Sequence, residues 1–91
     1  MANHRSAIKR HRQSINRRAR NRHYMSMLRN SVKLFAASLE EGDAAVAQDA
    51  FRKAERTIRR VAGKGIIHER TAARKVSRLS RALNNYRANN A

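Results

Sequence analysis

The positions of glycine and proline constrain the fold of this chain more than any other sequence feature. The 91 residues contain no proline, and their three glycines lie at positions 42, 63 and 65. Because glycine and proline are the strongest breakers of regular structure, these positions divide the chain into three uninterrupted segments of helical length. The sequence therefore predicts one all-α domain over residues 1–91, with turns near residue 42 and over residues 63–65.

Apolar residues recur in each segment at alternating steps of three and four, the spacing that lines one face of an α-helix. In chain order the three stripes are Met25, Leu28, Val32, Phe35 and Leu39; Ala47, Phe51, Ala54, Ile58 and Val61; and Ala72, Val76, Leu79, Leu83 and Tyr86. Gly42 suits the left-handed conformation that follows a helix end, and Asp43 can cap the next helix. Short turns between stripes of similar length predict a three-helix bundle with antiparallel neighbours over residues 23–41, 44–62 and 68–87.

The first helix is expected to continue beyond the bundle at its N-terminal end. Ile8 and Ile15 lie off the apolar stripe, and cations point in nearly every direction around the axis between residues 5 and 22. A helix that is polar all round does not face a protein core. Residues 1–22 are therefore predicted to form a basic arm. It would be continuous with a first helix about 55 Å long, and frayed in isolation.

Charge predicts the class of partner. The chain carries 17 Arg and five Lys against six acidic residues, for a formal net charge of +16, and no acid precedes Glu40. Leu, Ile, Val and Phe supply only 16 of the 91 residues, so a chain with this charge is marginally stable without a polyanion. Guanidinium groups bind phosphate with two parallel hydrogen bonds, which favours nucleic acid. With only four aromatic residues, helices and backbone-directed cations are expected to recognise the shape of RNA.

Other chemistries find little support in the sequence. Cysteine is absent, which excludes disulfides and thiol chemistry. His68 begins a near match to a zinc-protease motif, but Ala72 stands where the second histidine is required, and His4 and His11 lack a third ligand. Residues 63–65 lack the spacing of a nucleotide phosphate loop. No catalytic residue, metal, cofactor or small-molecule substrate is therefore expected, and no apolar run is long enough to span a membrane.

Several motifs together resemble one family, the twentieth protein of the bacterial small-subunit ribosomal series. They are ANHRSAIKR at 2–10, RQS at 12–14, RRARNR at 17–22, AGKGIIH at 62–68, AARK at 72–75 and SRL at 77–79. The resemblance covers essentially the whole chain. It departs from the family pattern at Glu69, Arg70 and Val76, where Lys, Asn and Lys are common.

The resemblance implies a three-helix bundle with a long first helix that binds 16S rRNA directly near the base of the small ribosomal subunit. It implies a role in early assembly of the 5′ domain, as a cytoplasmic, ribosome-bound monomer. The positions that match the family motifs imply RNA contacts for Lys9, Arg10, Arg12, Arg17, Arg18, Arg20, Asn21, Arg22, Lys64, Gly65, His68, Arg74, Lys75, Ser77 and Arg78. Glu69 is left out because it can complement the positive end of the third helix.

Three alternatives share parts of this pattern. A nucleoid-type DNA-binding protein would need a dimer interface or a helix with base-reading side chains, for which the third helix offers Arg70, Arg74 and Asn84 or Asn85. A cationic helix acting at anionic membranes needs a continuous apolar face, which the basic arm lacks. An organelle transit peptide over residues 1–39 conflicts with the family-like start. Met27 and Leu34 lie away from the first stripe. The sequence leaves two roles open for them: widening the core face toward a third helix, or contacting RNA.

Overall fold

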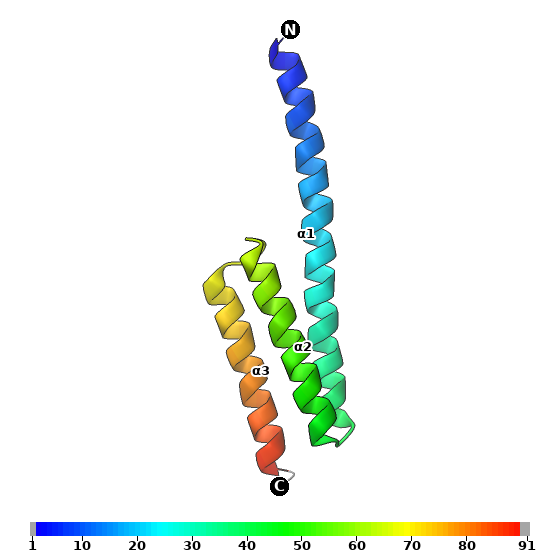
Figure 1. The fold of residues 1–91 in the computed structure, drawn as a ribbon, viewed down its shortest axis with the longest axis vertical. Coiled ribbons are helices and arrows are strands. Elements are labelled where there is room, and N and C mark those ends of the chain that lie inside the picture. Colours follow the sequence, from blue (N-terminus) through cyan, green and yellow to red (C-terminus); the bar gives the residue numbers. More distant parts are fainter. Residues whose placement is uncertain (1, 90–91) are drawn as a thin grey trace.

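The computed structural model describes residues 2–89, with the side chains of residues 4–89. The described residues form three helices and no strand: α1 spans Ala2–Glu40, α2 spans Ala44–Gly63 and α3 spans Glu69–Asn89. Figure 1 shows α1 running well beyond the other two helices at its N-terminal end. The predicted all-α fold with a long first helix is confirmed.

The three helices are arranged as a flattened row. α2 lies between α1 and α3 and runs antiparallel to both (Figure 1). α1 and α3 approach each other much less than either approaches α2, and the molecule measures 69 × 22 × 12 Å. The core therefore consists of two interfaces that share α2, which makes α2 the helix on which the fold depends most.

The apolar stripes meet in two core clusters, one near each turn. The first contains buried Leu28, Ile58, Val61 and Ala72, and the second contains buried Phe35, Ala47, Ala54 and Leu83. The remaining stripe residues are partly buried against these clusters, and Leu79 packs against both. Phe35 and Phe51 meet edge to face with ring centroids 6.0 Å apart, the geometry that aromatic pairs prefer. The predicted core positions are therefore confirmed.

The turn between α1 and α2 follows from two adjacent residues. Gly42 has a φ of +79°, the left-handed conformation that residues with a Cβ rarely adopt. Asp43 then caps α2: its Oδ1 accepts hydrogen bonds from the backbone nitrogens of Ala45 at 2.9 Å and Val46 at 3.4 Å. This cap satisfies amides that the helix itself leaves unpaired. Both predicted roles are confirmed.

The basic arm is helical along the described part of its length. α1 is continuous from Ala2 to Glu40, about 58 Å at 1.5 Å per residue, close to the expected length. Alanine, arginine and glutamine have high helix propensity, and no glycine or proline interrupts the arm. Every side chain from His4 to His23 is exposed, including Ile8 and Ile15. This part of α1 therefore buries no side chain within the described part of the chain.

The two unassigned apolar residues have different surroundings. Leu34 is 60% exposed and lines a groove of about 250 Å³ between α1 and α2, together with Val46 and Ala50. Met27 is half-buried but belongs to neither core cluster. Leu34 therefore does not widen the core.

Candidate nucleic-acid interface

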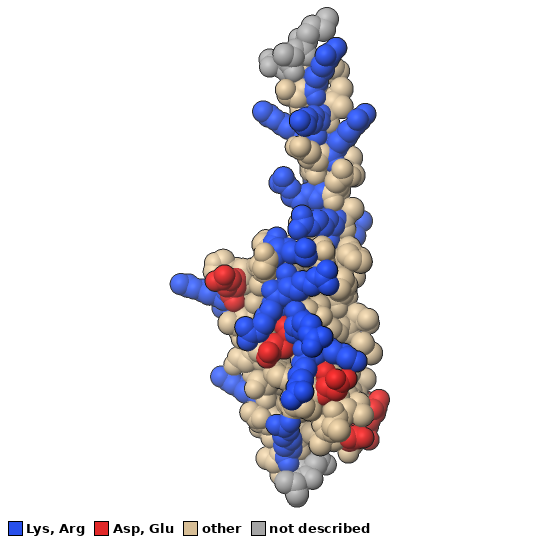
Figure 2. Space-filling model, in the orientation of Figure 1, with Lys and Arg blue, Asp and Glu red and all other residues tan. Residues whose placement is uncertain are grey.

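Positively charged side chains extend along the length of the molecule. Figure 2 shows Lys and Arg side chains projecting from the arm in several directions and continuing over the bundle, while Asp and Glu occur only on the bundle. Among the described residues, Lys53 pairs with Asp49 at 3.1 Å and Arg59 with Glu55 at 3.7 Å, and these are the salt bridges. No other Lys or Arg forms a salt bridge within the described residues. This surface is suited to binding a polyanion.

The arm supplies the largest group of predicted RNA-binding residues. All of them are exposed: Lys9, Arg10, Arg12, Arg17, Arg18, Arg20, Asn21 and Arg22. Successive residues of a helix point about 100° apart, so these side chains surround the axis instead of forming one stripe. Such an arrangement suits a helix that is contacted from several sides rather than one that lies on a flat surface.

A second predicted group lies in the turn between α2 and α3. Figure 1 shows this turn beside α1, where the arm leaves the bundle. Lys64 and Gly65 are exposed, and Gly65 has a φ of +75°. The Nδ1 atom of His68 accepts a hydrogen bond from the backbone nitrogen of Arg70 at 3.0 Å. His68 therefore caps the start of α3, a structural role that the sequence analysis did not assign to it.

The predicted residues of α3 do not share one face. Arg74 and Arg78 are exposed and lie one turn apart, on the side opposite the core stripe. Lys75 is half-buried and points about 100° away from Arg74. Ser77 is exposed at the edge of a groove between α2 and α3. α3 thus presents Arg74 and Arg78 as a pair, whereas Lys75 and Ser77 lie elsewhere on the helix surface.

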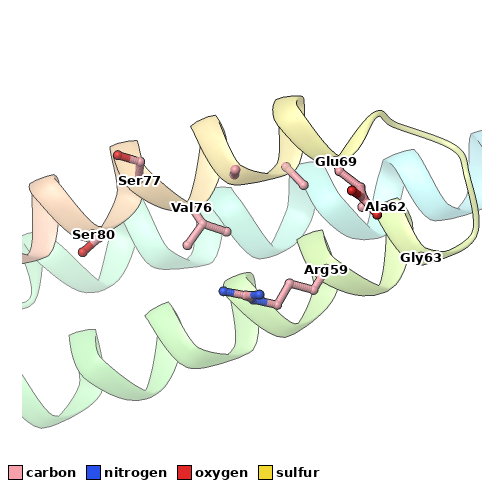
Figure 3. A pocket seen from close by; sticks show the side chains of 9 residues that line it. Arg59, Ala62, Gly63, Glu69, Val76, Ser77 and Ser80 are labelled. Carbon is pink, nitrogen blue, oxygen red and sulfur yellow. The ribbon is translucent and has the colours of Figure 1, made fainter.

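That groove has a volume of about 620 Å³ and a mostly apolar floor. Figure 3 shows Val76, Ser77 and Ser80 of α3 on one side and Arg59 of α2 on the other. Glu69 lies at the end of the groove near the α2–α3 turn. The guanidinium of Arg59 already pairs with Glu55, so the groove contributes little free positive charge.

The structure also brings together four residues that the sequence analysis did not combine. Tyr24 of α1 is half-buried against the first core cluster. Three cations surround its ring: Lys64 Nζ lies 5.0 Å from the ring centroid, Arg60 Cζ 5.7 Å and Arg20 Cζ 6.0 Å. These separations allow cation–π attraction to the electron-rich ring. We call Tyr24, Arg20, Arg60 and Lys64 the Tyr24 cluster.

The electrostatic field at the Tyr24 cluster is positive enough to affect the phenol. The pKa of Tyr24 lies below its ordinary value of 10.0, chiefly because of hydrogen bonding with Lys64. Partial burial of the ring opposes this shift, and the charges of Lys64, Arg60 and Arg20 add to it. The cluster therefore stabilises negative charge at this position.

Two members of the Tyr24 cluster were missed as candidate contacts. Tyr24 directly precedes the first apolar stripe, and it packs against the first core cluster. Arg60 lies outside the motifs that carry the family resemblance. Its place one turn before Gly63 indicated that it lies near the turn, but the sequence did not show that α1 passes beside that turn.

Two further features bear on other classes of function. Among the described residues, His, Cys, Asp and Glu side chains do not gather in groups of three or more that could hold a metal ion. No helix in the described part of the chain is long and apolar enough to cross a membrane.

Comparison with known proteins agrees with these observations. The family described as "Ribosomal protein S20" matches residues 2–84. The chain is 52% identical over 84 residues to "Small ribosomal subunit protein bS20" of Solidesulfovibrio magneticus, covering 92% of this chain and 94% of the relative. It is 48% identical to the protein of the same name from Maridesulfovibrio salexigens, covering 92% and 97%. A third relative of that name, from Desulfovibrio desulfuricans, is 44% identical over 88 residues, covering 97% and 99%. The chain therefore belongs to the ribosomal protein S20 family.

Proposed function

We propose that this protein is a structural constituent of the small ribosomal subunit that binds 16S rRNA directly and supports assembly of the subunit. Its relatives carry the name of a small-subunit ribosomal protein, and its family is structural rather than enzymatic. The protein is ribosome-bound in this role.

The basic arm is the observation that carries the proposal. Between His4 and His23 the arm holds eight Lys and Arg residues and no acid, and each of these side chains is exposed. A helix that buries nothing within its own chain needs another surface to cover it. Because the cations point in all directions, that surface is a polyanion that contacts the helix from several sides.

RNA phosphates supply such a surface. Each Lys or Arg that neutralises a phosphate releases condensed counterions, which drives binding without base recognition. The bundle holds the arm at one end, so phosphates from different RNA segments can approach the same helix. Neutralising their mutual repulsion favours compact RNA, which is the physical basis of the proposed role in assembly.

The predicted contacts outside the arm fit the same mode. Lys64 and Gly65 lie beside the base of the arm, and Arg74 and Arg78 form an exposed pair on α3. These positions extend the cationic surface from the arm along the bundle. We propose that the protein binds as a monomer, with the arm inserted between RNA helices and the bundle lying against their backbones.

Competition binding tests this proposal. Purified protein is titrated with labelled 16S rRNA against unlabelled tRNA and duplex DNA at about 50 and 200 mM salt, the range over which non-specific phosphate binding weakens strongly. We expect preference for 16S rRNA to persist at the higher salt. Equal loss of binding to all three nucleic acids would contradict a specific rRNA site. Preference for duplex DNA would support a nucleoid-type protein instead.

Deletion of residues 1–22 tests the role of the arm. The core clusters begin at Tyr24, so the truncated chain retains the side chains that form the bundle. We expect circular dichroism to show a helical bundle that no longer binds 16S rRNA tightly. Full-strength binding by the folded, truncated protein would show that the arm is dispensable.

A further inference from the structure

We propose that the Tyr24 cluster is a preformed site for one phosphate of the RNA backbone, in which Tyr24 is the positioning residue for Arg20, Arg60 and Lys64. The inference rests on the proposed function, because it takes RNA as the polyanion. It adds a defined contact point, and it assigns functions to Arg60 and Tyr24 that neither the motifs nor the family match indicated.

Three separate elements contribute to the site. Arg20 and Tyr24 lie one turn apart on α1, Arg60 lies in the last turn of α2, and Lys64 follows directly after α2. Their charged groups lie 5.0 to 6.0 Å from one ring centroid. Residues separated by about 40 positions in sequence are therefore held at one point, where the arm leaves the bundle.

The cluster has no internal counter-charge. Within the part of the chain that the structure describes, the salt bridges are Lys53–Asp49 and Arg59–Glu55, and neither includes Arg20, Arg60 or Lys64. All three cations are exposed. Three positive side chains around one ring, without a carboxylate, repel one another, and an anion bound beside them would relieve that repulsion.

An aromatic ring is well suited to hold such cations for a ligand. One side of Tyr24 packs against the core cluster around Leu28 and Ile58, which holds the ring in place. The ring attracts the cations through its quadrupole but does not neutralise them, as a carboxylate would. The guanidinium groups of Arg20 and Arg60 therefore keep their charge and their N–H donors for a phosphate oxygen. Lys64, which hydrogen-bonds with the phenol, keeps its charge and its remaining N–H donors.

A backbone phosphate fits the site better than a free small anion. The cations are exposed and open to a large ligand, and the positive charge continues along the arm through Arg17, Arg18 and Arg22. A polymer can occupy the cluster and the arm together, whereas a single phosphate ion cannot. Binding at the cluster would also tie α1 to α2 and the turn, so it would hold the arm in one direction relative to the bundle.

Single substitutions in the full-length protein separate this site from general charge. Arg60→Gln removes one cation of the cluster, and Arg56→Gln removes an exposed cation one turn earlier on α2, outside the cluster. If Arg60 contacts a phosphate and Arg56 does not, Arg60→Gln weakens 16S rRNA binding about five- to eightfold at 0.1 M salt. Arg56→Gln is expected to bind as the unchanged protein does. Equal effects of the two substitutions would overturn the proposal.

Substitution of Tyr24 tests positioning at constant charge. Tyr24→Leu keeps the apolar packing and the net charge but removes the ring, so we expect affinity for 16S rRNA to fall about two- to fivefold, with binding to tRNA unchanged. Tyr24→Phe keeps the ring and should restore most of the affinity. Circular dichroism and thermal unfolding of each variant report its fold. Loss of the same size in Tyr24→Phe and Tyr24→Leu would refute the role of the ring.

A measurement without RNA detects the anion site itself. Sodium phosphate is added at constant ionic strength to protein carrying ¹³C-labelled tyrosine, and the phenol of Tyr24 is titrated by NMR. Phosphate bound among the cations should move the pKa of Tyr24 back toward its ordinary value, with chloride as the control. No difference between the two anions would argue against an anion site. A phosphate effect combined with unchanged rRNA affinity of Arg60→Gln would overturn the assignment to RNA.

These outcomes distinguish the two proposals. If the unchanged protein shows no preference for 16S rRNA, the proposed function fails. If that preference is strong but neither Arg60→Gln nor Tyr24→Leu reduces it, the function stands and the phosphate site is refuted.

Discussion

The arm should bind RNA through the number of its phosphate contacts, and neutralising four of its arginines tests this quantitatively. Arg12, Arg17, Arg18 and Arg22 are all exposed and lie outside the Tyr24 cluster. We consider the variant in which each is replaced by Gln. Because glutamine is a good helix former and these side chains bury nothing within the chain, stability should change by less than about 0.5 kcal/mol.

The size of the effect follows from counterion release. Each phosphate contact contributes about 0.7 to 0.9 to the slope of log affinity against log salt concentration. If all four arginines contact phosphates, the slope becomes shallower by about 3, and the affinity at 0.1 M salt falls by about a thousandfold. If only some of the four arginines contact phosphates, the change in slope and the loss of affinity are both smaller.

Fluorescence anisotropy of labelled 16S rRNA, measured from about 50 to 400 mM salt, provides both numbers. The matched control replaces the same four arginines by Lys, which preserves charge but not the two-pronged geometry of guanidinium. The control should retain the salt slope of the original protein. A Gln variant that remains helical and keeps both the original slope and the original affinity would refute phosphate binding by the arm.

Three further predictions concern stability and ionisation. Phe35 is 1% exposed in the second core cluster, so Phe35→Ala should cost about 3 to 5 kcal/mol and lower the thermal midpoint of the bundle sharply; a shift of only a few degrees would mean that the core repacks. Asp43→Ala should cost about 1 kcal/mol in urea unfolding through loss of the α2 cap, while Asp43→Asn, which also caps helices, should stay close to the original. In a Tyr86→Phe variant, the remaining phenol should titrate below its ordinary pKa of 10.0, chiefly through hydrogen bonding with Lys64; a normal titration curve at 295 nm would contradict the cluster geometry. Because its folded pKa is the lower one, this phenol stabilises the fold above its unfolded pKa, and the gain is lost as pH falls through the folded pKa.

The helices and their core faces could be predicted because both depend on local pattern. Glycines end α1 and α2 near Gly42 and Gly63, and the three-four spacing of apolar residues identifies the side chains that become the two core clusters. The exposed arm was predicted for the same reason, since a segment polar all round has no face to bury. Its fraying in isolation stays a prediction.

The candidate site was predictable only in part. The resemblance to a ribosomal family implied RNA contacts in the arm, the turn and α3, and these residues lie exposed, apart from the half-buried Lys75. It did not show that His68 caps α3 or that Arg60 lies with Lys64 beside α1. Side-chain partners across different helices depend on helix rotation and on which helices are neighbours, which periodicity within one segment does not specify.

The sequence by itself therefore determined three helices, their buried faces and a strongly positive charge, since each of these depends on local residues or on composition. Tertiary structure alone decided that α2 lies between α1 and α3 and that the α2–α3 turn stands at the base of the arm. That arrangement gathers Arg20, Arg60 and Lys64 around Tyr24. The physical reason is that helix–helix packing sets distances between residues far apart in sequence, and a phosphate site depends on those distances.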